Sequence, residues 1–324
     1  VFFHTFYLFK SDQPQTHTIA LMQGQSLGGI AVYIFFFLSG MFITSSFISL
    51  KGNYAFVIMR IFRIWPALII CIVFAVFIAG PMVSTHSVKE YFASRGTWDY
   101  LVHGVLLYHV RYTLPGVFEA NYYPSAVNGS IWTLPIEIVC YFMIWLFGIA
   151  GVFKNKIASI LVYSLVIALY ILNFKSIRDF LNTPFPFFVA GSLFYIFRKN
   201  ILIDYRIAIA LVIIYGVFLK VFLLYIALMY WVLVLGSSGI FKKIKLPGDY
   251  SYGIYIYAFL VQQLVAYYDP AISPYKSLLI TVPFTVLLAS LSWHFIERPS
   301  IQLARKITGH IRYGEPVRQL LGKE

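Results

Sequence analysis

The sequence predicts an all-α fold, namely a polytopic transmembrane bundle of about ten helices with both termini in the cytoplasm. Three observations lead to this prediction. The chain is 60% hydrophobic and only 11% charged, whereas about a quarter of the residues in an ordinary soluble domain are charged. Apolar runs of membrane-spanning length recur along the chain. Basic residues lie between these runs and favour one side of the expected membrane.

A transmembrane helix needs about 20 apolar residues and tolerates internal Pro or Gly. The expected spans lie near residues 1–10, 28–50, 62–82, 131–150, 157–174, 183–198, 203–219, 220–237, 250–269 and 276–296. The seventh and eighth, which meet at Lys220, can also be interpreted as one bent segment. The chain begins without Met inside an apolar run, so we expect its first span to lack its beginning. We therefore expect a transmembrane domain over residues 1–299 and a basic cytoplasmic tail over residues 300–324.

The basic residues predict the orientation. If the first span runs outward from the cytoplasm, the inner loops and the tail hold 17 of the 25 Lys and Arg residues, and the outer side holds the other eight. This bias follows the positive-inside rule and predicts an even number of spans. The net charge of +13 arises from short dispersed clusters rather than from one basic face. We therefore expect the lipid bilayer, and not nucleic acid, as the partner of this charge.

Two smaller predictions follow from the connections and the cysteines. The only long connection, residues 83–130, lies outside in this orientation, and its stretch Trp98 to Tyr112 predicts an interfacial or re-entrant helix. Its histidines, His103 and His109, suit interfacial packing better than catalysis. The chain has only two cysteines, both in apolar runs, which indicates small buried side chains rather than a disulfide framework or a metal site.

Glu137 is the first candidate for a functional residue, because it is a single carboxylate in an otherwise apolar helix. Burial of a lone carboxylate is unfavourable by several kcal/mol, so an intramembrane Glu indicates a functional site. His4 lies six residues before Lys10, and Glu137 lies seven residues inside the outer end of its span. At about 1.5 Å per residue, both lie roughly 10 Å below the outer interface. They could form a catalytic base with its orienting carboxylate, or a structural contact between two helices.

Basic and acidic residues also occur near the expected inner face. Arg60 and Arg63 are three residues apart at the start of a helix, where they could bind phosphates on one side or anchor the helix by the positive-inside rule. His294 and Glu297, also three residues apart, end the last span. We expect a salt-bridge cluster there at the level of the lipid headgroups.

Six stretches occur in the order of the motifs of a known family. They are Val1 to His4, Tyr33 to Gly40, Arg60 to Leu68, Trp132 to Glu137, Ser251 to Tyr255 and Phe295 to Pro299. They resemble the motifs of membrane-bound acyltransferase family 3, the ten-helix bacterial O-acyltransferases. Two positions depart from the family pattern. Ala258 stands where many members carry a His, and Ile138 stands where a second Glu often follows the first.

The resemblance implies an enzyme of the inner, or plasma, membrane that transfers an acyl group. The donor would be acetyl-CoA or another acyl-CoA, and the acceptor a sugar hydroxyl of a surface or exported glycan, or of a lipid-linked sugar. His4 would be the leading catalytic residue with Glu137 as its partner, Arg60 and Arg63 would bind the donor, and no metal would be needed. The weaker candidates for a substrate path are Tyr33, Ser39, Trp132 and Tyr255. Ser39 and Gly40 also suit close helix packing.

Two other functions remain open at this level. In a proton-coupled transporter or flippase of a small solute or lipid-linked sugar, His4 and Glu137 would relay protons. The sequence shows no paired broken segments in two matching halves, as many such transporters have. A degenerate, scaffold-like member of the family is the third possibility.

Overall fold

The computed structural model describes residues 8–9, 26–50, 53–173, 181–238 and 247–309. Within these ranges the regular elements are helices, and one isolated antiparallel bridge joins Thr113 to Ala126. The predicted all-α class is therefore confirmed for this part of the chain. The expected first span lies outside the described residues except for Leu8 and Phe9, which are buried against Phe259 and Ala266.

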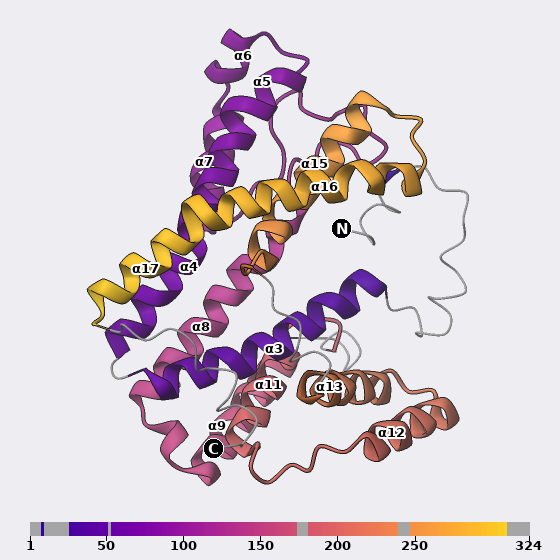
Figure 1. Cartoon of the computed structure of the whole chain (residues 1–324). Coiled ribbons are helices and arrows are strands. Elements are labelled where there is room, and N and C mark those ends of the chain that lie inside the picture. Colours follow the sequence, from indigo (N-terminus) through magenta and orange to yellow (C-terminus); the bar gives the residue numbers. More distant parts are fainter. Residues whose placement is uncertain (1–7, 10–25, 51–52, 174–180, 239–246, 310–324) are drawn as a thin grey trace. The chain divides into compact units, whose positions relative to one another are not determined.

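Helices coincide with the expected spans from the second onward. Four helical stretches are long and apolar enough to cross a membrane, namely Leu27–Ser49, Asn53–Val83, Gly129–Ile149 and Pro274–Ile307. Shorter apolar helices cover Lys156–Ile171, Phe185–Phe197, Tyr205–Phe218 and Val221–Ser237. A further helix, α15, covers Ser251–Tyr268. The order of these helices is shown by colour in Figure 1.

The chain divides into two compact units, and each is made of segments that are distant in sequence. The first unit comprises Val1–Pro14, Ile58–Pro135 and Leu246–Ile311. The second comprises Gln15–Val57, Ile136–Lys245 and Arg312–Glu324. The boundaries fall inside α4 (Asn53–Phe74) and near the start of α8 (Leu134–Ile149), so both helices contribute to both units.

In the second unit, α3 (Leu27–Ser49) and α11 (Phe185–Phe197) pack closely through two glycines. A Cβ atom on Gly40 would clash with the backbone oxygen of Phe188, and one on Gly191 would clash with that of Phe37. Small residues let helix backbones approach each other in this way. The interpretation of Gly40 as a packing residue is therefore confirmed. Large aromatic side chains fill the rest of this core, together with the free, buried Cys140.

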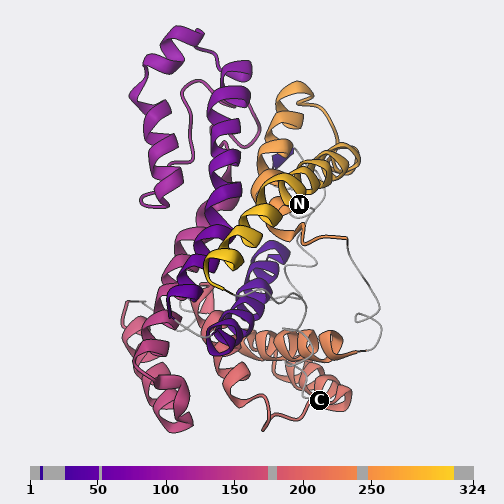
Figure 2. The ribbon, with the colours of Figure 1, turned by 60° about the vertical axis from the view of Figure 1, so that its left-hand side comes forward.

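The helices α12 (Tyr205–Phe218) and α13 (Val221–Ser237) are separate and lie side by side in Figures 1 and 2. Leu219 takes a left-handed conformation (φ 48°, ψ 41°) and Lys220 an extended one, and together they end the first helix. The alternative of one bent segment is thus wrong. The same unit contains α9 (Lys156–Ile171), which follows η3 (Val152–Lys154) and is capped by Asn155.

In the first unit, α4 continues through a π-helical segment, η1 (Ala75–Ala79), into α5 (Gly80–Val83). The hydroxyl of Tyr91 donates to the backbone oxygen of Val76 at 3.0 Å, within this π segment. Tyr91 belongs to α6 (Val88–Ala93), and α6 is followed by α7 (Arg95–Leu106), which runs beside α4 in Figures 1 and 2. Trp65 of α4 donates its ring N–H to the oxygen of Val105 on α7 at 3.0 Å.

The helix expected from Trp98 to Tyr112 is confirmed only in its first part. It ends at Leu106 because Leu107 and His109 take positive φ values of 53° and 46°, which no continuing right-handed helix allows. His109 is exposed and packs edge-on against Tyr108. His103 is half-buried, and its Nδ1 lies 2.7 Å from the oxygen of Tyr108.

The last helices form one long rod. It consists of α16 (Pro274–Ser292), the π segment η4 (Trp293–Glu297) and α17 (Arg298–Ile307). α15 packs against α16 where Gly253 meets Ala289, and a Cβ on this glycine would lie 2.8 Å from the Cα of Ala289. Because α17 reaches Ile307, the first residues of the predicted tail continue the rod as a helix.

Candidate functional site

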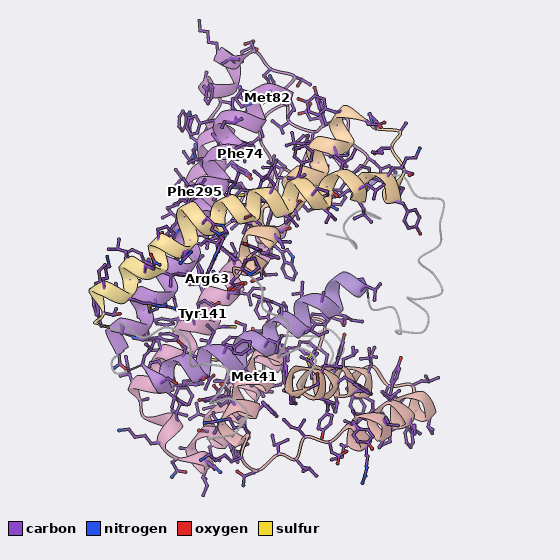
Figure 3. All side chains as sticks on the ribbon, viewed as in Figure 1. Met41, Arg63, Phe74, Met82, Tyr141 and Phe295 are labelled. Atoms are coloured by element: carbon purple, nitrogen blue, oxygen red, sulfur yellow. The ribbon has the colours of Figure 1, made fainter. Side chains whose placement is uncertain are left out.

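Arg63, which is labelled in Figure 3, is the centre of a charged cluster in the first unit. Its Nη1 donates to Oε2 of Glu297 at 3.0 Å, and its Nη2 donates to Oδ2 of Asp249 at 2.7 Å. The rings of Tyr252 and Trp293 have their centroids 5.7 and 5.9 Å from the guanidinium carbon. Two carboxylates and two aromatic rings thus surround one cation.

The π segment η4 directs Glu297 toward Arg63. In this segment the N–H of Arg298 bonds to the oxygen of Trp293, five residues earlier instead of four. The Glu297 side chain is fully buried, and its Oε1 accepts a hydrogen bond from Ser292 Oγ at 3.0 Å. His294 is exposed, and its Nδ1 lies 2.8 Å from the oxygen of Ser290. The expected salt bridge at Glu297 is therefore confirmed with Arg63 as its partner, whereas His294 instead contacts the backbone of its own helix.

Asp249 is the more accessible partner of Arg63. Its side chain is 53% exposed, and it lies just before the start of α15. The hydroxyl of Ser251 donates to its Oδ1 at 2.5 Å, so each carboxylate oxygen has a separate contact. Asp249 was not among the residues predicted from the sequence. A usable signal was its position two residues before a serine at a helix start, which is typical of local side-chain capping.

Arg60 lies one turn before Arg63 on α4 and is half-buried. Residues three apart on a helix share a face. Of the two arginines, Arg63 is the one whose ion pairs with Glu297 and Asp249 the structure shows. The structure places Arg60 and Arg63 in the same unit, and it adds two carboxylate partners to Arg63.

A second polar cluster joins two of the motif stretches. The hydroxyl of Tyr255 on α15 lies 2.5 Å from Thr133 Oγ1 and also contacts the oxygen of Ser130. Both partners belong to η2, a short 3₁₀ helix (Gly129–Thr133) that leads into α8. Trp132 in the same turn is 42% exposed. Tyr255, predicted to line a substrate path, thus ties η2 to α15.

Further hydrogen bonds connect α15 to the segment that precedes η2. Gln263 is fully buried and donates to the backbone oxygens of Tyr123 and Ala126, at 2.9 and 2.6 Å. Its own Oε1 and backbone oxygen accept from Asn121 Nδ2, at 2.9 and 3.0 Å. Asn128 donates to the oxygen of Ile256 at 2.7 Å. The sequence analysis missed this network, although two successive glutamines in an apolar helix were a visible signal.

Glu137 lies in the first turn of α8 and belongs to the second unit. It is 4% exposed, and its Oε2 accepts a hydrogen bond from the hydroxyl of Tyr141, one turn later, at 3.0 Å. The positive end of the helix dipole favours a carboxylate at this position. Tyr141 is labelled in Figure 3. His4 lies outside the described residues, so the pairing of His4 with Glu137 stays a prediction.

The two weaker candidates on α3 are both buried. Tyr33 stacks on Phe187 with a centroid distance of 4.5 Å and donates to the oxygen of Asn182 at 2.9 Å. The ring of Tyr225 lies edge-on to Tyr33 at 5.5 Å. Ser39 precedes the packing glycine Gly40. These contacts give Tyr33 and Ser39 positions in the core of the second unit.

No group of three or more His, Cys, Asp or Glu side chains that could hold a metal ion occurs in the described ranges. Cys71 is free and buried, and its thiol contacts the oxygen of Ile256 at 3.3 Å. The interpretation of both cysteines as small buried side chains is thus confirmed.

Comparisons with known proteins cover nearly the whole chain. A family model described as an acyltransferase domain matches residues 1–296. A protein of Shigella phage Sf6 named O-acetyl transferase is 28% identical over 315 residues, which cover 89% of this chain and 88% of that protein. Nodulation protein 10 of Rhizobium leguminosarum bv. viciae is 26% identical over 308 residues, which cover 84% of this chain and 82% of that protein. No solved structure matches the chain.

Proposed function

This chain belongs to the acyltransferase domain family, and from that membership we propose that it transfers an acetyl group from acetyl-CoA to a sugar hydroxyl of a surface or exported glycan. The match that spans residues 1–296 carries the proposal. The relative named O-acetyl transferase supports acetyl as the group and oxygen as the acceptor atom. The apolar helices of the structure fit an enzyme that works within a membrane.

The chemistry requires a base for the acceptor hydroxyl. His4, oriented by Glu137, would remove the hydroxyl proton as the oxygen attacks the thioester carbonyl. The carbon–sulfur bond then breaks, and the CoA thiolate leaves with the electron pair. Proton removal by a positioned histidine contributes about 10²- to 10⁴-fold in rate. The burial of Glu137 and its contact with Tyr141 support a fixed carboxylate for this role.

The donor would bind through Arg60 and Arg63. A guanidinium group recognises phosphate by paired hydrogen bonds, and CoA carries several phosphate groups. Tyr252 and Trp293 lie beside Arg63, and such aromatic faces can stack on the adenine of the donor. Trp132, whose side chain is partly exposed, is the strongest of the four candidates for the acceptor path.

We place the enzyme in the inner membrane as a multi-pass protein with about ten spans and both termini in the cytoplasm. The helices found at the expected positions after the first span support this topology, and so does the distribution of basic residues. Residues 1–299 would form the membrane domain and residues 300–324 the cytoplasmic tail. The basic residues of α17, Arg305 and Lys306, fit a position at the inner surface.

Release of free CoA thiol tests the proposed function. The full-length protein, in detergent or vesicles, receives acetyl-CoA with and without a glycan fraction from its host. We expect thiol release that depends on the glycan and is lost in the His4→Ala variant. Thiol release that the His4→Ala variant retains would contradict the role of His4. Folded protein that releases no thiol with any acyl-CoA or acceptor would contradict the transferase and favour the transporter.

A further inference from the structure

The two carboxylates that bind Arg63 differ in burial. The side chain of Glu297 is fully buried, whereas that of Asp249 is 53% exposed. Glu297 bonds to Nη1 and Asp249 to Nη2, so the two partners use different nitrogens of the same guanidinium. One half of the cation thus faces a buried partner, and the other half faces a partner that water can reach.

The energetics of these two pairs differ accordingly. Removal of one partner from a buried pair leaves an uncompensated charge in a medium of low dielectric, which is strongly unfavourable. An exposed pair contributes little, because water and salt screen it and because it restricts two flexible side chains. An incoming anion can therefore replace Asp249 far more easily than Glu297.

The local contacts allow Asp249 to leave Arg63 without unfolding its surroundings. Its Oδ1 accepts from Ser251 Oγ, which starts α15, and only Oδ2 binds Arg63. The contact with Ser251 can persist when the contact with Arg63 is broken. Glu297 is held in place by Ser292 through its other oxygen, so it continues to hold Arg63 in position.

We propose that Asp249 is a displaceable internal competitor for the donor, and that Glu297 is a positioning residue that holds Arg63 for the exchange. A phosphate group of the donor would take the place of the Asp249 carboxylate on Nη2, since a guanidinium N–H donates a charge-assisted hydrogen bond to either anion. This inference rests on the proposed function. Asp249 would thereby raise the concentration of acetyl-CoA that the enzyme needs, and it would not affect a donor without phosphate.

A comparison of two donors distinguishes the proposed displacement of Asp249 from a general effect on folding. Acetyl-CoA carries phosphates, whereas S-acetyl-pantetheine carries the same thioester without any phosphate. In the Asp249→Asn variant the amide can keep the contact with Ser251 but loses the negative charge. We expect the KM for acetyl-CoA to fall about two- to fivefold, the range of an exposed ion pair. The kcat, and the KM for S-acetyl-pantetheine, should stay unchanged.

Asp269→Asn is the matched control. Asp269 is exposed and lies at the opposite end of α15, so its substitution removes the same charge without a change near Arg63. It should leave both KM values unchanged. An unchanged or higher KM for acetyl-CoA in the Asp249→Asn variant would overturn the proposal. An equal change in the KM for both donors would overturn it as well.

The positioning role of Glu297 predicts the opposite change in the KM for acetyl-CoA. In the Glu297→Gln variant Arg63 loses its buried countercharge, and the KM for acetyl-CoA should rise at least about tenfold, with little change for S-acetyl-pantetheine. If this variant does not fold, Ser292→Ala removes only the hydroxyl that holds Glu297, and it should raise the same KM about two- to threefold. An unchanged KM in the folded variants would contradict the positioning role.

Binding of CoA itself distinguishes this inference from the proposed function. Equilibrium dialysis with labelled CoA measures affinity without turnover. Tighter binding to the Asp249→Asn variant than to the unaltered protein would support the displacement even if no thiol were released. Equal binding to both proteins, or binding to neither, would overturn it.

Discussion

The interactions inside the first unit differ from those inside the second unit. In the first, polar groups of α15 bind neighbouring segments, namely the side chains of Gln263 and Tyr255 and the backbone oxygen of Ile256. In the second, α3 and α11 pack mainly through Gly40 and Gly191 with aromatic side chains around them, and a hydroxyl contact between Thr44 and Ser192 at 2.6 Å joins the same helices. Hydrogen bonds have defined directions, whereas apolar packing depends mainly on volume. The first unit is thus suited to hold motif residues in fixed orientations, and the second to hold helices at a fixed spacing.

The two buried carboxylates in the described part of the chain follow this division. Glu297 in the first unit bonds to a cation and to a serine, and both contacts join separate turns or helices. Glu137 in the second unit accepts a hydrogen bond from Tyr141 on its own helix. We therefore propose that Glu297 serves the geometry of the donor site and Glu137 the proton chemistry. The following predictions test this contrast, beginning with the largest expected effect.

Glu137→Gln should reduce acetyl transfer about 100-fold or more, because it removes the charge that orients the base. The amide has almost the same shape and can still accept from Tyr141, so the thermal unfolding temperature should change little. Glu297→Gln should instead lower that temperature, since breaking a buried ion pair costs about 3–5 kcal/mol. Activity assays and thermal unfolding of both variants check this. The contrast fails if the two variants lose activity and stability to the same extent.

Gly40→Leu should destabilise the second unit by about 3 kcal/mol, the upper end of the usual cost of overpacking, because its side chain has no space beside the backbone of Phe188. Gly216→Ala is the control. No atom lies within 4 Å of a Cβ at that position in α12, and the change favours the helix slightly. Thermal unfolding in detergent measures both. Equal stability of these variants would show that close packing of α3 and α11 is not needed.

Gln263→Met should cost about 1–3 kcal/mol, since it leaves the buried polar groups around it without their partner. The effect should be confined to the first unit, and hydrogen exchange should increase in residues 113–128. Gln302→Met, at an exposed position of α17, is the control and should change neither stability nor exchange. Unchanged exchange in the Gln263→Met variant would contradict the polar attachment of this connection.

The smallest expected effect concerns α6, which lies in the long connection over residues 83–130. Ser87 donates its hydroxyl and its backbone N–H to Glu90, and these hydrogen bonds lower the pKa of the Glu90 carboxyl. A lowered pKa in the folded state stabilises the helix above the unfolded-state pKa, and this contribution is lost as pH falls through the folded value. Hydrogen exchange of α6 should therefore rise in acid, and Ser87→Ala should weaken this pH dependence. An unaltered dependence in that variant would exclude the capping box as its cause.

The sequence predicted the positions of the helices well, because membrane spans are long apolar runs and their boundaries are marked by charged or turn residues. It failed at the end of α7, where two residues with positive φ stop a helix that their side chains would permit. It also predicted a salt-bridge cluster at Glu297 that included His294, but the partner is Arg63. Helical spacing assumes 3.6 residues per turn, and the π segment η4 violates that assumption.

The candidate site was only partly predictable for a similar reason. Arg63 and Glu137 stand out because charges are rare in apolar helices. Asp249 and Gln263 gain their importance from partners more than 100 residues away, and no local pattern contains that information. The resemblance to family motifs identified the stretches that matter. It did not show that Arg63 is bound to two carboxylates.

Transfer of isotope-labelled acetyl from acetyl-CoA to a glycan tests the central claim most directly. The unaltered protein and the Glu137→Gln variant receive the labelled donor and a host glycan fraction, and the label in the glycan is measured before and after mild base, which cleaves O-acetyl esters. We predict base-labile label in the glycan with the unaltered protein, reduced about 100-fold in the variant. The absence of label in the glycan, or equal label with both proteins, would contradict the account.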